Sequence, residues 1–430
     1  MGLDGATVWE VRTGGSDTNG GGYVATGTDY SLFDAAELTL TNVTCTGDTT
    51  LTDADDGGEF TDAMIGNILY LSDGKWYQIM SRTDADNIVI DQNGPTDTGM
   101  TLNVGGALAT PGGLGAVLAA HGVSGNKAYI KSGTYPLSVA GANVPNGSLS
   151  LSVGNMATDS DCYIECYQTT REDLGTPPKY LCSVVPTNGY AVYLKGTTGE
   201  PHTIVNMHID GGSVGVIGIR CANTYDSNMI NCLAENCTDG FYGGQAYHCE
   251  SKNNSHYGFY GVNASLCWAH GNGSNGFNYA LALSNCISSD NTNEGFYNTR
   301  LGVINCISYN NSKDGFRSST QDLIYINCIA ADNGEHEYQL RPSCKLMNCA
   351  SKVGASGRST GGVADFNPIV LTADPFIDVA NGDFRLNNVA GGGLLCRAAG
   401  LGVYGQPGTM NVGAVLVEEK KRRLQMRVIQ

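Results

Sequence analysis

A repeat of about 20 residues is the feature that most constrains how this 430-residue chain can fold. Cysteine returns at spacings of 17 to 22 residues, and a Gly-Phe pair returns in phase with it. The cysteines are Cys232, Cys249, Cys267, Cys286, Cys306, Cys328 and Cys349, and the pairs begin at Gly240, Gly258, Gly276, Gly295 and Gly315. A period of this size indicates a solenoid, in which each repeat packs only against its neighbours.

The content of one repeat selects the kind of solenoid. Residues 301–316 hold two short β-favouring runs separated by an Asn/Ser/Lys/Asp/Gly turn, and no repeat holds ten residues of helix-forming sequence. The leucine offsets of leucine-rich repeats and the calcium-binding nonapeptide are absent. The sequence therefore predicts a parallel β-helix with one coil per repeat, in which Cys306, Phe316 and their counterparts point inward and stack about 4.8 Å apart.

The cysteines are interpreted as core residues. Their number, 15, is odd, so at least one is unpaired, and no CxxC pair of the kind that holds zinc is present. In-register thiols in a dry core behave as small apolar side chains. We expect reduced, buried thiols, no metal and no cofactor, and assembly in a reducing compartment.

Both ends of the chain resemble right-handed parallel β-helix proteins of the pectin-lyase-like superfamily. Residues 8–21 resemble the first strand and the Gly-Ser-Asp turn that open many of them, and residues 109–135 resemble their capping helix and first coil. Residues 374–386 and 411–415 are similar to the family's closing coils. The helix is also predicted without the family, with Thr110 as the N-cap and Pro111 at the first position.

The fold implied is all-β: a right-handed parallel β-helix solenoid of about a dozen coils, with a short N-terminal capping helix and a small inserted antiparallel β-subdomain. We expect an opening strand in residues 1–23, the inserted subdomain in 24–107, the β-helix with its closing coils in 108–415, and a basic tail in 416–430. The subdomain is expected because β-favouring runs alternate with Asp/Gly turns there.

Charge excludes some function classes. The net charge is −17 with only 15% charged residues, which argues against nucleic acid or an anionic membrane as a partner. No run of eighteen apolar residues exists, and the first residues lack a basic segment followed by an apolar one. We therefore expect no nucleic-acid partner, no membrane insertion and no export by a signal peptide.

The resemblance leaves two functions open, because this architecture hosts lyases, hydrolases and inert fibres alike. The chain is most similar to the phage members of the family. The first hypothesis is a phage virion structural protein (a tail spike, fibre or head-decoration subunit), without enzymatic activity, assembled in the host cytoplasm. It would be a homotrimer that contacts other virion proteins and host-surface polysaccharide. The alternative is a polysaccharide lyase or glycoside hydrolase that uses acidic residues on the β-helix face.

The candidate catalytic residues are carboxylates in neighbouring turns: Glu294, Asp314, Asp290 and Asp332. Glu294 and Asp314 precede the Gly-Phe pair of consecutive repeats, so we expect them one coil apart. A close carboxylate pair can serve as acid and base. The alternative is turn chemistry, because Asp239 and Asn275 occupy the same slot.

A second candidate surface follows the ladder phenylalanines. If those rings point inward, the next residues point outward, and they include Tyr242, Tyr260, Tyr297 and Arg317. Tyrosine and arginine are enriched at interfaces, so this stripe is expected either to stack on sugar rings or to contact a partner chain.

Overall fold

The computed structural model describes residues 5–24, 27–55, 57–121, 125–137, 149–152, 162–182, 189–195, 201–222, 227–319, 322–352, 358–359, 363–397 and 399. The chain divides into two compact units, residues 1–214 with 219–228, and residues 215–218 with 229–430. In the part of the chain that the structure describes, no helix has the length and apolarity needed to cross a membrane.

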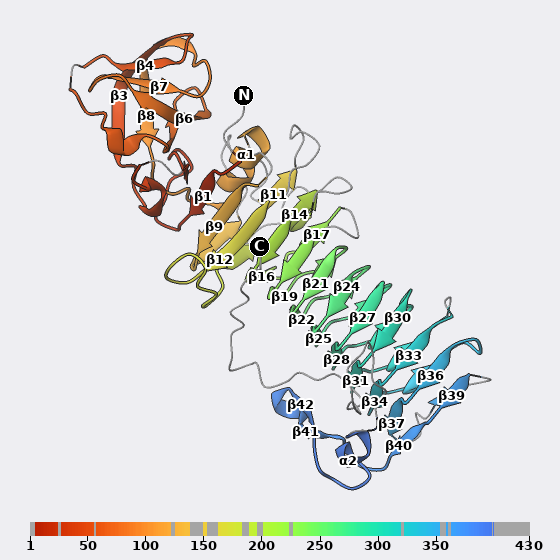
Figure 1. The fold of residues 1–430 in the computed structure, drawn as a ribbon. Helices are drawn as coiled ribbons and strands as arrows, with labels where there is room; N and C mark the ends of the chain where they lie inside the picture. Colours follow the sequence, from red (N-terminus) through yellow and green to blue (C-terminus); the bar gives the residue numbers. More distant parts are fainter. Residues whose placement is uncertain are drawn as a thin grey trace. The chain divides into compact units, whose positions relative to one another are not determined.

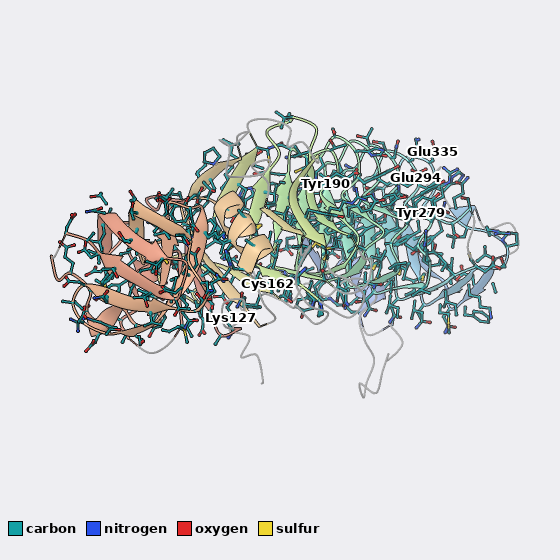
Figure 2. All side chains as sticks on the ribbon, turned by 90° about the horizontal axis from the view of Figure 1, so that it is seen from above. Lys127, Cys162, Tyr190, Tyr279, Glu294 and Glu335 are labelled. Atoms are coloured by element: carbon teal, nitrogen blue, oxygen red, sulfur yellow. The ribbon has the colours of Figure 1, made fainter. Side chains whose placement is uncertain are left out.

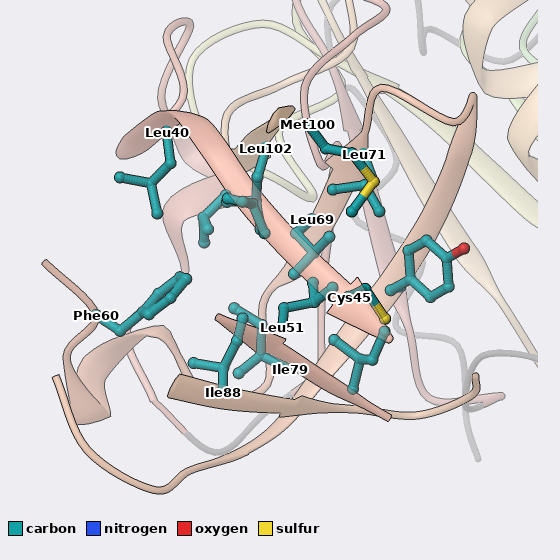
Figure 3. Packing of buried hydrophobic residues seen from close by; sticks show 14 of the residues in the cluster. Leu40, Cys45, Leu51, Phe60, Leu69, Leu71, Ile79, Ile88, Met100 and Leu102 are labelled. Carbon is teal, nitrogen blue, oxygen red and sulfur yellow. The ribbon is translucent and has the colours of Figure 1, made fainter. Parts of the chain in front are cut away.

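The first unit contains a small antiparallel barrel, which confirms the predicted inserted β-subdomain of the fold (Figure 1). Its strands close in the order β3 (Leu38–Thr46), β4 (Thr50–Asp53), β7 (Asn87–Ile90), β6 (Lys75–Arg82), β5 (Ile68–Leu71) and β8 (Thr96–Val104). Alternate residues of each strand point inward, and Leu51, Leu69 and Leu102 are among the fully buried side chains of its core (Figure 3). Two 3₁₀ turns accompany the barrel, η1 (Tyr30–Leu32) and η2 (Asp62–Met64).

The rest of the first unit is parallel β-helix. One sheet contains β2 (Gly22–Tyr23), β1 (Val8–Val11), β9 (Lys127–Lys131), β12 (Tyr163–Tyr167) and β15 (Thr203–Val205). A second contains β10 (Thr134–Leu137), β13 (Lys179–Cys182) and β16 (His208–Asp210), and a third contains β11 (Leu149–Ser152) and β14 (Tyr190–Lys195). All of these pair in parallel except β2, which is antiparallel to β1.

The predicted helix is present as α1 (Pro111–His121). The Thr110 hydroxyl accepts a hydrogen bond from the Gly113 N–H at 2.9 Å, so Thr110 is the N-cap that the sequence indicates. Asp17 in turn accepts from the Thr110 backbone N–H at 2.9 Å and from its hydroxyl at 2.7 Å. The start of the helix is thereby fixed by the Gly-Ser-Asp turn near the N-terminus.

The second unit repeats one coil of three strands (Figure 1). Its first sheet contains β21 (Gln245–Tyr247), β24 (Asn263–Ser265), β27 (Ala282–Ser284), β30 (Gly302–Ile304), β33 (Ile324–Ile326), β36 (Lys345–Met347) and β39 (Ala364–Phe366). Its second sheet contains β19 (Leu233–Glu235), β22 (Glu250–Lys252), β25 (Trp268–His270), β28 (Ile287–Ser289), β31 (Ile307–Tyr309), β34 (Ile329–Ala331), β37 (Ala350–Lys352) and β40 (Ile369–Leu371). Its third sheet contains β20 (Phe241–Tyr242), β23 (Phe259–Tyr260), β26 (Phe277–Asn278), β29 (Phe296–Tyr297), β32 (Phe316–Arg317), β35 (Tyr338–Gln339) and β38 (Arg358–Ser359). Two further strands, β17 (Ile217–Cys221) and β18 (Asn228–Ile230), fall on the division between the units.

The predicted ladders line the interior of these coils. Successive phenylalanine rings from Phe241 to Phe316 stack face to face with centroids 4.7 to 5.0 Å apart, and Tyr338 extends the stack at 5.1 Å. All fifteen cysteines are buried, and none forms a disulfide. The parallel β-helix with thiols in its core is therefore confirmed.

A buried row of asparagines runs beside the phenylalanines. In each step the side-chain N–H group of one asparagine donates to the side-chain oxygen of the next, at 2.8 to 3.0 Å. The row consists of Asn254, Asn272, Asn291, Asn311 and Asn333. It ends at Glu337, whose Oε2 accepts from Asn333 at 2.6 Å. The buried amides are thus paired along the solenoid, as a dry core requires.

The C-terminal described segment covers the second sheet of the second unit. Residues 374–386 are expected from the sequence to form closing coils, but they form a separate antiparallel pair outside the solenoid sheets, β41 (Phe376–Asp378) and β42 (Asp383–Leu386), joined by the 3₁₀ turn η4 (Val379–Asn381). Phe376, Phe384 and the short helix α2 (Gly393–Cys396) share one apolar cluster with Ile287, Ile307 and Ile329. Residues 411–415 and the basic tail 416–430 lie outside the described residues.

Candidate functional site: a tyrosine row and a carboxylate pair

The outer face of the third sheet of the second unit presents a row of tyrosines. Tyr242 and Tyr260 stack with centroids 4.7 Å apart, and Tyr260, Tyr279 and Tyr297 follow in edge-to-face steps of 5.9 Å. We call Tyr242, Tyr260, Tyr279 and Tyr297 the tyrosine row. The rings are partly exposed, so the row is available to a ligand.

Tyr279 belongs to the row although it occupies a different place in the repeat. The predicted outward residue of its coil, Asn278, is buried, and Tyr279 follows it with a φ of 50°. Glycine or asparagine occupies this left-handed slot in the neighbouring coils, at Gly261 and Asn298. A bulky residue there costs about 1 kcal/mol or more, and such strain is concentrated at functional sites.

Arg317 joins the tyrosine row to two carboxylates. It is in register with Tyr297, and its guanidinium carbon lies 5.6 Å from the centre of that ring. Its Nη1 lies 2.7 Å from Glu294 Oε1 and 3.6 Å from Asp314 Oδ2. One cation therefore contacts the end of the row and both predicted catalytic carboxylates.

Glu294 and Asp314 lie on adjacent coils, as expected. The Gly295 N–H donates to the Asp314 carbonyl at 3.0 Å, and both carboxylate side chains are buried. Because both carboxylates approach the same Nη1, their contacting oxygens are no further apart than the sum of those two distances. Such proximity suits paired acid and base roles. Figure 2 shows where Glu294 and Tyr279 lie on the second unit.

His336 contacts one of the two carboxylates, Asp314. It is the next residue in the same slot after Glu294 and Asp314, and its Nδ1 lies 2.8 Å from Asp314 Oδ1. Burial raises the pKa of Asp314 above its usual value, and contacts with His336 and Arg317 offset part of that rise. Asp314 Oδ2 is buried and makes no hydrogen bond, and the Arg317 guanidinium lies 3.6 Å from it.

The same cluster has a donor set for a cation. Ligand atoms of Asp314, Glu335 and His336 lie within 4.8 Å of one another. Carboxylate and imidazole groups can together hold a transition metal. However, the Arg317 guanidinium at 3.6 Å from Asp314 already supplies positive charge there. We therefore derive no step through a metal.

A second histidine–carboxylate pair lies on the same face. His256 Nδ1 is 3.1 Å from Asp239 Oδ1, and Tyr257, the neighbour of His256, stacks on Tyr260 at 5.5 Å. The sequence reasoning did not single out His256, His336, Tyr257 or Tyr279. For His336 a signal existed: alignment of the repeats on Phe316 and Tyr338 places it in the slot of Asp314.

Asp290 and Asp332 occupy a different slot of the repeat. Each directly follows a strand of the second sheet and adopts a left-handed backbone, with φ of 57° and 59°. Asn310 takes the same slot in the coil between them and donates to Asp290 at 2.7 Å. Asp332 forms an ion pair with Lys352 at 2.6 Å. Asp and Asn are the residues that tolerate this conformation best, so turn geometry accounts for both aspartates.

The fold and this face define a parallel β-helix protein with a tyrosine-lined carboxylate pair. No protein-family model matches the chain, and no curated protein matches it. Among solved structures, it is similar to the A-module of the mannuronan C-5 epimerase AlgE4 from Azotobacter vinelandii, at 13% identity over 60% of this chain and 76% of that one, with a TM-score of 0.42. It is also similar to pectate lyase Pel9A, at 15% identity over 69% of this chain and 89% of that one, with a TM-score of 0.38. The Agl-KA catalytic domain matches at 10% identity over 85% and 84%, with a TM-score of 0.35. At these values the function has to be argued from the side chains of the site.

Proposed function

We propose that this protein binds a polysaccharide along the tyrosine row and cleaves it beside Glu294 and Asp314. The observation that carries the proposal is the position of Arg317, which contacts the Tyr297 ring and both carboxylates. A glycan stacked on the tyrosine row would therefore lie beside the two carboxylates at the Tyr297 end of the row. The strained backbone at Tyr279 supports the binding role, because it brings a ring to a position where neighbouring coils have Gly261 or Asn298.

The two carboxylates have different surroundings, and this difference assigns their roles. Asp314 has a raised pKa and an oxygen without a hydrogen bond, so it is the candidate general acid that protonates the leaving oxygen. Glu294 Oε1 accepts a hydrogen bond from Arg317 Nη1 at 2.7 Å, so Glu294 is the candidate nucleophile or base. His336 positions Asp314 through their 2.8 Å contact.

The test compares Glu294→Gln and Asp314→Asn with the unaltered protein on a panel of neutral and acidic polysaccharides. Each change keeps the side-chain volume, and we expect turnover to fall by about 10²–10⁴-fold while the fold persists. Asp290→Asn is the matched control, because it alters an exposed aspartate in the turn slot and should leave turnover unchanged. Hydrolysis incorporates water into the products, whereas a lyase leaves a carbon–carbon double bond, so product analysis separates the two reactions. Full turnover in both variants would refute the catalytic assignment.

The second candidate is the virion structural role, in which the same face binds glycan without cleaving it. The burial of both carboxylates favours it, because the side chains of Glu294 and Asp314 are 7% and 0% exposed and so have little direct access to a bound glycan. Binding to a glycan that remains intact after prolonged incubation, with loss of affinity in Tyr297→Ala, would support this role over cleavage.

A further inference from the structure

An apolar strip lies on the outer face of the first sheet in the second unit, away from the strands that bear the candidate site. The last residues of four consecutive strands are in register and apolar, and Ile324 lies beside them. We call Ile304, Ile324, Ile326, Met347 and Phe366 the apolar strip. Phe366 is 52% exposed and Ile324 is 44% exposed.

The coil itself does not require these apolar residues. The two preceding strands have Ser265 and Ser284 at the position that Ile304 occupies in the next coil. These serines hydrogen-bond to each other at 2.9 Å, and the coils still stack. The apolar strip is therefore not needed for the coils to stack. A contiguous, exposed apolar surface of this kind marks a site of association.

We propose that the apolar strip binds a second copy of this chain in an antiparallel pair. A two-fold axis along the strand direction, between β33 and β36, would place β33 of one copy over β36 of the other. Ile326 would then meet Met347, and Ile304 would meet Phe366. Ile324 would lie over Lys345 of the other copy, whose methylene chain can cover it.

Charges beside the strip fit this arrangement. Asp322 is exposed just before β33, and Arg341 is exposed in the turn before β36. Within one chain the two are only loosely paired, at 4.0 Å. The two-fold axis would bring Asp322 of each copy opposite the Arg341 turn of the other, so the flanking charges are complementary.

The chemistry of the strip also favours a second copy over a charged partner. The net charge of −17 opposes self-association over most of the surface, so an uncharged strip is the place where two copies can approach with the least repulsion. None of the five strip residues is charged, and the two-fold operation brings four of them, Ile304, Ile326, Met347 and Phe366, against one another. Four coils span only about 19 Å, so we expect a small interface and a dissociation constant in the micromolar range.

The test is the native mass by light scattering, with the full chain measured from about 1 to about 100 µM. We expect the mass to rise with concentration from 45.1 kDa towards twice that value. Phe366→Ser and Ile326→Ser should each weaken the pair at least tenfold. Val370→Ser is the matched control, because Val370 is equally exposed but lies on the second sheet, and its variant should pair like the unaltered protein. Circular dichroism and thermal melting establish that each variant keeps its coils.

A charge reversal tests the orientation. Asp322→Arg should weaken the pair by placing like charges opposite each other, and the double change Asp322→Arg with Arg341→Asp should restore it. A protein that stays monomeric at every concentration overturns the proposal, as does a dimer that is indifferent to Phe366→Ser. A mass of three chains also overturns it, and supports the homotrimer expected from the sequence.

Discussion

At the residue scale, the asparagine row shows how one side chain can couple the core to pH. The side-chain amides of the row hydrogen-bond to one another from coil to coil, and the row ends on the buried carboxyl group of Glu337. Burial is the largest effect on this group and raises the pKa of Glu337 to about 7 from 4.5. The folded protein therefore holds a proton here that the unfolded chain has already released.

This proton gives a signed prediction. The folded-state pKa is raised, so stability associated with Glu337 is present below pH 4.5 and is lost as the pH rises to about 7. Glu337→Gln removes the titration but keeps an acceptor for Asn333. The free energy of unfolding is measured with urea, in the presence of a chelator, from pH 5 to pH 8. Over this range we expect the value for the variant to rise relative to that of the unaltered protein by on the order of 3 kcal/mol. Parallel stability curves for the two proteins would contradict the prediction.

At the element scale, the C-terminal strands are held on the second sheet by a few aromatic contacts. The centroid of the Phe384 ring lies 6.0 Å from that of Trp268, 5.9 Å from that of Tyr309 and 5.3 Å from that of Phe376, and each pair packs edge to face. The outward Ile287, Ile307 and Ile329 of the second sheet would be exposed without this cover. The segment thus replaces water over an apolar face of the solenoid.

Removal of one ring should release this segment locally. Phe384→Ala deletes an aromatic side chain from a buried cluster, at a cost of about 3–5 kcal/mol. Because this cluster joins the segment to the second sheet, we expect Trp268 to become accessible while the coils stay folded. Acrylamide quenching of tryptophan fluorescence should increase, since Trp9 and Trp76 are buried elsewhere. Phe33→Ala, at an exposed ring of the first unit, is the control. Quenching equal to that of the control would show that the segment is held by other contacts.

At the scale of the whole molecule, the fifteen buried thiols report on the integrity of the fold. Burial raises the pKa of Cys182 and of Cys396 to about 12, whereas at Cys249 and Cys286 the effect of burial is outweighed by hydrogen bonds from neighbouring thiols, which lower the pKa of both. All fifteen sulfurs are buried, so exclusion of a reagent by the packed core protects them whatever their pKa. An aromatic disulfide reagent should react rapidly with none of the thiols in the native protein and with all fifteen in denaturant. Reducing agent should leave the melting temperature unchanged. Fast reaction of several thiols in the native state would contradict the packing described here.

The sequence alone determined the architecture of the second unit. Each repeat carries its own inward cysteine and phenylalanine, and this local pattern has one compatible geometry, the stacked coil. The proximity of Glu294 and Asp314 followed from the same periodicity, and so did the outward direction of Tyr297 and Arg317. The inserted antiparallel subdomain was recognisable because its strands alternate and are separated by turn residues, whereas its closure into a barrel was not predicted.

Only the tertiary structure decided how the coils meet at the site. Repeat lengths vary by a few residues, so contacts such as His336 with Asp314 depend on which turn absorbs the difference. Tyr279 reaches the tyrosine row because its backbone is left-handed, and the pattern of side chains in the repeat does not predict this conformation. Phe384 finds the second sheet across more than one hundred residues, because the free energy of covering an apolar face depends on the exposed area and not on proximity in sequence. Periodic contacts are encoded within one repeat, whereas contacts between different repeats exist only after the coils have stacked.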